Sequence, residues 1–132
     1  MTARQLIETA NKAREKAYAP YSGFTVGAAL LATDGRVFTG CNIENSSYTP
    51  TCCAERVAIF KAVSEGCKAF DAIAVVGGEG DCVRDKCYPC GVCRQVMSEF
   101  CSEDMKIYFS NGDIITLGEL LPFGFSLKTD ER

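Results

Sequence analysis

The sequence predicts an α/β fold, a single-domain three-layer sandwich in which a mixed five-stranded sheet has helices on both faces. Helical and strand-like segments follow one another in the order α-β-β-α-β-α-β-β-α, which suits helices packed on a sheet. Two dipeptides, Asp34-Gly35 and Asn111-Gly112, stand between apolar runs and mark tight hairpins. No repeat, low-complexity tract or long linker interrupts the 132 residues. We therefore expect one domain over residues 1–132.

The first half of the chain supplies a helix, a hairpin and a second helix. Thr2 is placed to cap a helix that runs to about Ala17, with apolar side chains recurring on one face. Residues 24–33 form a mostly apolar strand, and residues 37–42 return antiparallel after the Asp-Gly turn. After a polar loop, residues 53–65 form a helix in which Phe60 and its apolar neighbours are expected to be largely buried, and Gly66 ends it.

The second half of the chain supplies the centre and the far edge of the sheet. Residues 72–76 are a short apolar run, which is typical of a central strand. Pro89 precedes a helix over residues 90–100. Residues 106–110 and 113–116 flank the Asn-Gly turn and predict an antiparallel hairpin, and a short helix over residues 117–121 precedes the tail.

Composition and charge exclude several classes of protein. The net charge of -3, the isoelectric point near 5.0 and the lack of a basic stripe favour a small-molecule substrate and no nucleic-acid partner. No apolar run approaches the roughly 18 residues of a membrane span, so no membrane partner is expected. The N-terminus lacks a secretory pattern, and the nine cysteines are odd in number. Free or metal-bound thiols in a reducing cytoplasm are therefore expected, and not a disulfide framework.

Three cysteines and one glutamate have the spacing of a catalytic zinc site. Cys53 is followed two residues later by Glu55, and Cys90 and Cys93 form a Pro-Cys-x-x-Cys pair downstream. Because the sequence contains no histidine, cysteines and carboxylates must hold any zinc. Three thiolate ligands leave one tetrahedral position for water. Glu55 stands too close to Cys53 in the sequence to be a fourth ligand, so it is the candidate acid and base beside the metal.

The charge of such a site needs compensation. All three cysteines are expected in the first turn of a helix, where the positive helix end favours thiolate over thiol. Three thiolates still leave a Zn²⁺ site at a net charge of -1, which weakens the metal as a Lewis acid. Arg56, one residue after Glu55, and Arg94, one residue after Cys93, are candidates to offset this charge by donating hydrogen bonds to ligand sulfurs.

Two other uses of the cysteines stay open at this point. Cys87 and Cys90 also form a Cys-x-x-Cys pair, which is compatible with a redox disulfide, although the thioredoxin-like context is missing. Cys87 could also join the other three in a structural Cys₄ zinc module, a reading that makes no use of Glu55. Cys82 has no assigned role.

The chain resembles the small, homotetrameric, zinc-dependent cytidine deaminase family. Any one of the blocks that carry this resemblance is modest evidence, but together they are specific and stand in the family's order. The blocks are Tyr18-Ala-Pro-Tyr-Ser-Gly-Phe24 with Val26-Gly-Ala-Ala29, Gly40-Cys-Asn-Ile-Glu-Asn45, Cys53-Ala-Glu-Arg56, Pro89-Cys-Gly-Val-Cys-Arg-Gln95 and Glu119-Leu-Leu-Pro122.

The resemblance implies a cytidine deaminase-like fold and the hydrolytic deamination of cytidine and 2′-deoxycytidine to uridine and 2′-deoxyuridine, a step of pyrimidine salvage that releases ammonia. It implies one Zn²⁺ per chain on Cys53, Cys90 and Cys93, with Glu55 as the proton shuttle and Arg56 beside the ligands. Among the substrate residues, it implies that Asn42 and Glu44 bind the ribose hydroxyls, that Phe24 flanks the base and that Ala54 contacts the substrate. A homotetramer with shared active sites is also implied, in which Tyr48 and Phe125 reach a neighbour's substrate.

The residues also bear on rival functions. A deaminase for another aminopyrimidine nucleoside, such as the blasticidin S type, is the nearest rival, and the Asn42 and Glu44 pair speaks against it because a ribose ring requires that pair. A structural zinc module would have no water on the metal. The antiparallel last strands expected from Asn111-Gly112 speak against the branch that edits tRNA. Large apolar side chains over residues 120–125 give a separate reason to expect a closed assembly of several chains.

Overall fold

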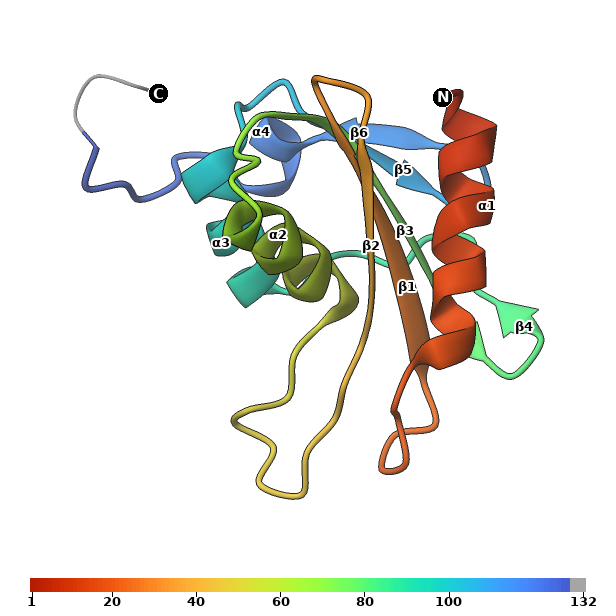
Figure 1. The fold of residues 1–132 in the computed structure, drawn as a ribbon. Coiled ribbons are helices and arrows are strands. Elements are labelled where there is room, and N and C mark those ends of the chain that lie inside the picture. The colour runs from red at the N-terminus through yellow and green to blue at the C-terminus, as the bar shows by residue number, and fades with distance from the viewer. Residues whose placement is uncertain (129–132) are drawn as a thin grey trace.

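The computed structural model describes residues 1–128 of the chain and places one mixed sheet between helices (Figure 1). The strands lie side by side in the order β2-β1-β3-β5-β6, and a short strand, β4, pairs with the end of β3. The elements are α1 (Ala3–Ala13), a 3₁₀ turn η1 (Arg14–Lys16), β1 (Thr25–Ala32), β2 (Val37–Cys41), α2 (Ala54–Ser64), β3 (Phe70–Glu79), β4 (Cys82–Val83), α3 (Gly91–Phe100), β5 (Lys106–Phe109), β6 (Ile114–Thr116) and α4 (Leu117–Leu120).

The sheet has the mixed topology that the order of elements predicts. β1 pairs antiparallel with β2 and with β3, β3 pairs parallel with β5, and β5 pairs antiparallel with β6. The parallel pair needs a crossover, and α3 lies within it between the two strands in sequence. Gly35 and Gly112 have φ values of 95° and 91°, so both hairpins turn at the expected glycine.

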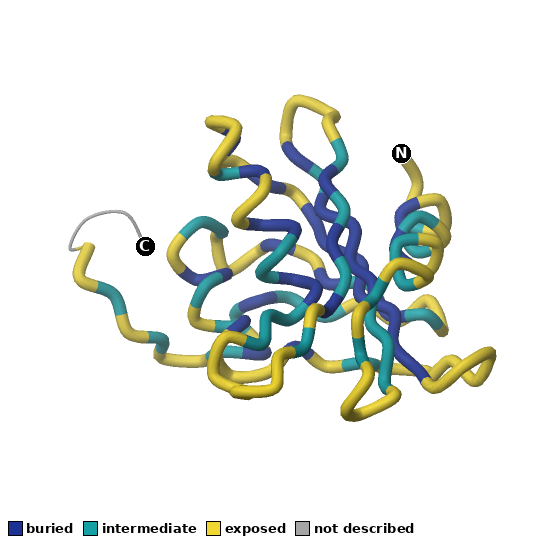
Figure 2. Tube along the Cα trace, turned by 60° about the horizontal axis from the view of Figure 1, so that its bottom comes forward, coloured by how far each residue is buried: buried dark blue, intermediate teal, exposed yellow. Residues whose placement is uncertain are grey.

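Apolar side chains on the two faces of the sheet form two separate clusters. Alternate residues of β1 point to opposite faces, so Ala28 and Leu30 pack on one side and Ala29 on the other. Leu6 and Ala10 of α1 cover the Ala29 face, while α2 and α3 cover the other face (Figure 1). The buried residues accordingly follow the middle of the molecule in Figure 2, with exposed loops at both ends.

Glycines in the sheet permit the helices to approach closely. A Cβ at Gly40 of β2 would lie 2.4 Å from the carbonyl oxygen of Ala54, the first residue of α2. A Cβ at Gly27 of β1 would lie 2.0 Å from the carbonyl oxygen of Ala10 in α1. Backbone atoms cannot move aside as a flexible side chain can. Both positions therefore require glycine if α1 and α2 are to pack this closely on the sheet.

Several details differ from the sequence prediction. β3 continues to Glu79, beyond the predicted end at Val76, and β4 was not predicted. The first helix is regular only to Ala13 because a 3₁₀ turn replaces its last predicted turn. The prediction that Phe60 is largely buried is wrong, since the residue is 47% exposed on the outer side of α2. Within residues 1–128, no helix is long and apolar enough to cross a membrane.

Candidate metal centre and substrate site

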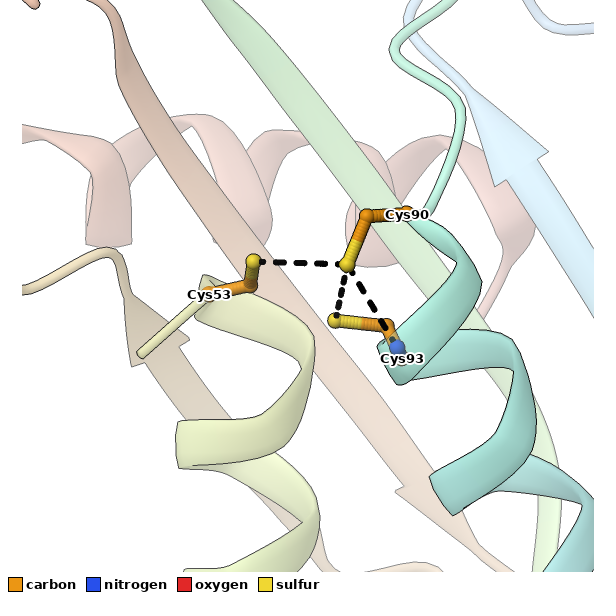
Figure 3. Close-up of side chains that lie close together, drawn as sticks. All are labelled: Cys53, Cys90 and Cys93. Atoms are coloured by element: carbon orange, nitrogen blue, oxygen red, sulfur yellow. Dashed lines mark hydrogen bonds between the residues drawn. The ribbon is translucent and has the colours of Figure 1, made fainter. Parts of the chain in front are cut away.

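The three predicted cysteine ligands meet where the N-terminal ends of α2 and α3 face each other (Figure 3). Cys53 and Cys90 are the N-cap residues of these helices, with extended backbones, and Cys93 lies in the first turn of α3. The Cys90 sulfur accepts a hydrogen bond from the backbone N–H of Cys93. The N-terminal end of α3 therefore supplies a backbone donor to one of the three sulfurs.

The spacing of the sulfurs fits zinc. The Sγ atoms of Cys53 and Cys90 are 3.7 Å apart, and those of Cys90 and Cys93 are 3.5 Å apart. A tetrahedral zinc with Zn–S bonds of about 2.3 Å holds its sulfurs about 3.8 Å apart. Among the residues that the structure describes, these three form the one cluster of His, Cys, Asp and Glu ligand atoms lying within 4.8 Å of one another. The chain thus offers zinc three protein ligands, which is the number typical of catalytic sites.

Electrostatics favour negative charge on the cluster. A hydrogen bond from the Cys93 thiol and the nearby Arg56 guanidinium lower the pKa of the Cys53 thiol to about 5, despite its burial. The same sulfur–sulfur hydrogen bond, together with burial, raises the pKa of the Cys93 thiol. A divalent cation bound by the three sulfurs would therefore displace the proton that the Cys93 thiol keeps.

The two arginines next to the ligands have different roles. Arg56 donates a hydrogen bond of 3.4 Å from its terminal nitrogen to the Cys53 sulfur, as predicted. The prediction for Arg94 is wrong. Its guanidinium donates to the carbonyl oxygens of Pro89 and Leu120, at 2.8 and 2.9 Å. Arg94 thus fastens the segment before Cys90 to the end of α4 and stabilises the ligand loop, while Arg56 carries the charge compensation.

Glu55 lies beside the cluster but outside it. The residue is 4% exposed, in the first turn of α2, and its carboxylate is not among the mutually close ligand atoms. Burial, and then the negative charge of Cys53, raise the pKa of the Glu55 carboxyl to about 7. A group with this pKa can both accept and release a proton near neutral pH, which is the requirement for an acid–base catalyst.

The remaining cysteines near the site do not join it. Cys87 is absent from the ligand cluster, and its thiol packs against the backbone of Gly77. Burial raises the pKa of the Cys87 thiol to about 11, so it remains protonated. Cys82 is exposed on β4, and all nine cysteines are free. The arrangement therefore lacks the fourth thiolate of a structural Cys₄ module and the disulfide of a redox pair.

Asn42 and Phe24 are connected through the backbone at the start of β1. The Asn42 side chain accepts a hydrogen bond from the N–H of Val26 and donates one to the carbonyl oxygen of Phe24, both at 2.8 Å. Asn42 is 9% exposed, so its amide is held in one orientation. This pair of bonds fixes the backbone of Phe24 at the edge of the site.

Glu44 is held by the turn that precedes Phe24. Its carboxylate accepts hydrogen bonds from the backbone N–H groups of Tyr21 and Ser22, at 2.9 and 3.1 Å, and from the Ser22 hydroxyl. The hydroxyl bond from Ser22, with these N–H groups, lowers the pKa of the Glu44 carboxyl. Ser22 also accepts a bond from the N–H of Phe24, so the two residues expected at the ribose and the one expected at the base share a single hydrogen-bonded turn.

Tyr48 and Phe125, the residues expected to act in a neighbour's site, lie on the surface. Tyr48 is 72% exposed, has a φ of 63° and contacts Tyr21 edge to face. Phe125 is 67% exposed, and its carbonyl oxygen accepts a hydrogen bond from the Gln95 side chain. Ala54, by contrast, is the first residue of α2 and has no exposed surface.

Sequence reasoning missed the residues that support the substrate side. Ser22 bonds Glu44, and Gly77 gives room to both the Cys87 sulfur and the Phe24 ring. Ser22 stands in the block from Tyr18 to Phe24 that carries the resemblance, but serine is common in turns, so the pattern does not point to a bond with Glu44. The paired Gly77-Gly78 at the end of an apolar strand was a usable signal, since glycine inside a strand often marks the close approach of another segment.

The fold, the three-thiol cluster and the buried Glu55 carboxyl beside it fit a zinc-dependent hydrolase. Comparison with protein families matches residues 1–110 to the cytidine and deoxycytidylate deaminase zinc-binding region. The chain belongs to the cytidine deaminase family.

Individual relatives agree with this membership. A cytidine deaminase of Sporosarcina psychrophila is 54% identical over 130 residues, which cover 96% of this chain and 93% of that protein. A cytidine deaminase of Halalkalibacterium halodurans is 54% identical over 132 residues, which cover 97% of each. The crystal structure of cytidine deaminase from Burkholderia pseudomallei superposes with a TM-score of 0.86 at 49% identity, covering 95% of this chain and all of that one.

Proposed function

We propose that this protein deaminates cytidine and 2′-deoxycytidine hydrolytically to uridine and 2′-deoxyuridine, with release of ammonia. The observation that carries the proposal is the buried carboxyl of Glu55 beside a cluster of three thiols that is open to a fourth ligand. Similarity over nearly the whole chain to proteins named cytidine deaminase supports the substrate class.

Glu55 performs the proton transfers in this proposal. Cys53, Cys90 and Cys93 would hold the zinc ion, which would supply Lewis-acid activation of the attacking water. The Glu55 carboxylate accepts the proton that water loses on attacking C4 of the pyrimidine. It gives that proton to N3, then takes the second proton from the hydroxyl formed on C4 and passes it to the amine, which leaves as ammonia while the C4 carbonyl forms. Its pKa of about 7 suits a group that must hold and release a proton in each turnover.

Substrate binding uses the hydrogen-bonded turn at residues 21–24 and the end of β2. Asn42 and Glu44 bind the ribose hydroxyls and Phe24 flanks the base, whereas Ala54, at the start of α2, has no exposed surface to offer a substrate. The bonds that Glu44 and Asn42 already make with the turn support this assignment, because they hold both side chains before the substrate arrives.

A homotetramer with shared sites completes the proposal. Tyr48 and Phe125 would reach the substrate of a neighbouring chain, and their exposure in the single chain supports this role. We further propose that residues 1–132 form one domain and that the protein works in the cytoplasm, where nine free cysteines would stay reduced.

An ultraviolet assay of the purified protein with cytidine tests the function. We expect a fall in cytidine absorbance matched by release of one ammonia per cytidine, and loss of both after treatment with a strong chelator. Added Zn²⁺ should restore them. A protein with one zinc per chain that releases no ammonia from cytidine or deoxycytidine would contradict the proposal.

A further inference from the structure

The hairpin formed by β3 and β4 carries a cation over the aromatic ring at the substrate side. The guanidinium carbon of Arg84 lies 5.0 Å from the ring centroid of Phe24. A guanidinium within about 6 Å of a ring centroid is attracted by the negative face of the ring. Neither Arg84 nor β4 has a part in the proton transfers described above, so this contact needs its own explanation.

The chain is built to bring Arg84 to this place. A Cβ at Gly78 of β3 would lie 2.1 Å from the carbonyl oxygen of Cys82, so β4 can return along β3 only over a glycine. The backbone N–H of Arg84 then donates a 2.9 Å hydrogen bond to the carbonyl oxygen of Gly77. These two close contacts fix the point at which the Arg84 side chain leaves the backbone.

The hairpin is also fastened at both ends. At its tip, the Arg14 guanidinium donates to the carbonyl oxygen of Gly80. After β4, the hydroxyl of Ser110 donates to the carbonyl oxygens of Arg84 and Asp85. The Glu79 carboxylate lies 3.3 Å from the Arg84 guanidinium and helps to direct it. The backbone contacts of the hairpin and the Glu79 carboxylate therefore set the position of the Arg84 guanidinium, although the Arg84 side chain is 61% exposed.

The ring of Phe24 has few other constraints. Its backbone is held by Ser22 and Asn42. Two of its ring atoms, Cε2 and Cζ, lie 3.0 and 3.1 Å from the place where a Cβ at Gly77 would stand, next to the Cys87 sulfur. One edge of the ring thus lies against β3, and the guanidinium of Arg84 lies over a face.

We propose that Arg84 is a positioning residue for the substrate base, because its guanidinium holds the Phe24 ring in the orientation that flanks the base. The inference rests on the proposed function, which assigns Phe24 to the base. Arg84 acts through the ring and touches no reacting atom. Its loss should therefore weaken substrate binding and leave the chemical step unchanged.

Steady-state kinetics with cytidine test this role on the zinc-loaded protein. We expect R84Q to raise KM about two- to fivefold, as the loss of one exposed cation–π contact implies, with kcat within twofold of the original. R84K should recover most of the difference because it keeps the charge. R36Q is the matched control, since Arg36 lies over Phe38 at 5.4 Å and pairs with Asp34, at the turn between β1 and β2. We expect R36Q to leave KM unchanged.

A double-mutant cycle with F24L decides whether Arg84 acts through the ring. Leucine has no aromatic face, so adding R84Q to F24L should change KM no further. An equal rise in that background would mean that Arg84 contacts the substrate itself, and a fall in KM would mean that the guanidinium occupies the face that the base needs. Either result overturns the inference, as does an unchanged KM in R84Q or an equal rise in R36Q.

Two controls keep the outcomes separate. Thermal unfolding reports whether each variant is folded, and R84M, which keeps most of the aliphatic stem, replaces R84Q if that variant unfolds at the assay temperature. A zinc-loaded original protein that releases no ammonia contradicts the proposed function. An active original protein whose R84Q variant keeps its KM contradicts the role of Arg84 alone.

Discussion

The candidate site joins two regions that differ in how far one chain completes them. The metal-binding region lies at the ends of α2 and α3, where Cys93 and Ala54 have no exposed surface and Glu55 is 4% exposed. Tyr48, in contact with Tyr21 on the substrate side, is 72% exposed, and the C-terminal segment carries Phe123 at 102% and Phe125 at 67%. The contrast is the one that the proposed shared site requires, in which a single chain builds its chemical groups and a neighbouring chain covers the substrate.

The difference has a physical origin. Thiolates and an acid–base carboxyl need fixed positions and restricted water, which a packed core supplies. A substrate has to enter and leave, so the parts that enclose it cannot all belong to that core. Exposed aromatic rings at the end of a small domain are suited to such a cover, because they bury apolar area only when another surface arrives.

Removal of one ligand is expected to break the metal-binding region completely. Cys90→Ala leaves two thiols, and we expect the purified protein to contain no zinc and to have no activity above background. Metal content per chain, measured by atomic emission, checks this directly. Cys87→Ser is the matched control from the same Cys-x-x-Cys pair, and it should keep one zinc per chain because its thiol lies outside the cluster. Loss of zinc from Cys87→Ser would instead support a four-thiol site.

Glu55→Gln separates the chemistry from the metal. The amide keeps the size of the side chain but cannot accept a proton, so zinc and fold should be retained. We expect kcat to fall by about 10² to 10⁴-fold, which is the usual contribution of acid–base catalysis. The fall should be larger if Glu55 serves several steps. Near-normal turnover in a zinc-loaded Glu55→Gln protein would remove Glu55 from the mechanism.

The metal-binding residues and the hairpins could be predicted from the sequence because both depend on local patterns. Cys53, Glu55, Cys90 and Cys93 act through local spacing at helix ends, so their pattern is visible in the chain and their geometry agrees with it. The hairpins were equally visible, because Asp-Gly and Asn-Gly turns need only local backbone conformations.

The predictions that failed concern residues whose surroundings depend on segments distant in the sequence. Arg56 and Arg94 both follow site residues, yet the partners of Arg94 are the carbonyl oxygens of Pro89 and Leu120, which only the folded chain brings near. A strand of two residues such as β4 has no periodicity to detect, and its position depends on the absence of a side chain at Gly78. Phe60 lies in a helix with apolar residues on all sides, so periodicity could not indicate which face is exposed.

The pH dependence of stability tests how well Glu55 is buried in the metal-binding region. The folded-state pKa of Glu55, about 7, exceeds its ordinary value of 4.5, so in this interval the folded chain binds more protons than the unfolded one. The contribution of the Glu55 carboxyl to the free energy of unfolding therefore falls as the pH rises from about 4.5 through 7. The full difference is about 3.5 kcal/mol at roughly 1.4 kcal/mol per pKa unit.

Denaturant unfolding of zinc-free protein at pH 5 and pH 8 measures this effect. The pKa of Cys53, lowered to about 5, acts in the opposite direction and is present in both proteins, so the comparison must be made with Glu55→Gln. We expect the free energy of unfolding of the original protein to fall by up to about 3 kcal/mol relative to Glu55→Gln between these pH values. An equal pH dependence in the two proteins would mean that Glu55 is solvated and ionised like a surface carboxyl.

Substitution of the exposed aromatic residues in the C-terminal segment is expected to have the smallest effect on activity. Phe125→Ala should raise KM about 2- to 13-fold, the range expected for one aromatic contact, and leave kcat and the assembly nearly unchanged. Phe123→Ala is the matched control from the same exposed segment and should keep the original KM. Steady-state kinetics and sedimentation velocity measure the two properties.

Mixing two defective proteins then decides whether the sites are shared. Glu55→Gln chains carry an intact Phe125 but no proton acceptor, and Phe125→Ala chains carry the acceptor but not the ring. If a neighbour's Phe125 covers each substrate, chains unfolded together and reassembled should form some sites with both groups. Those sites should have the original KM, so activity at low cytidine concentration should exceed the sum of the two separate proteins. Each protein reassembled alone should show no such gain. Activity that equals the sum of the separate proteins, or a fully active monomer in sedimentation, would mean that each chain closes its own site and that the exposed aromatic residues serve another purpose.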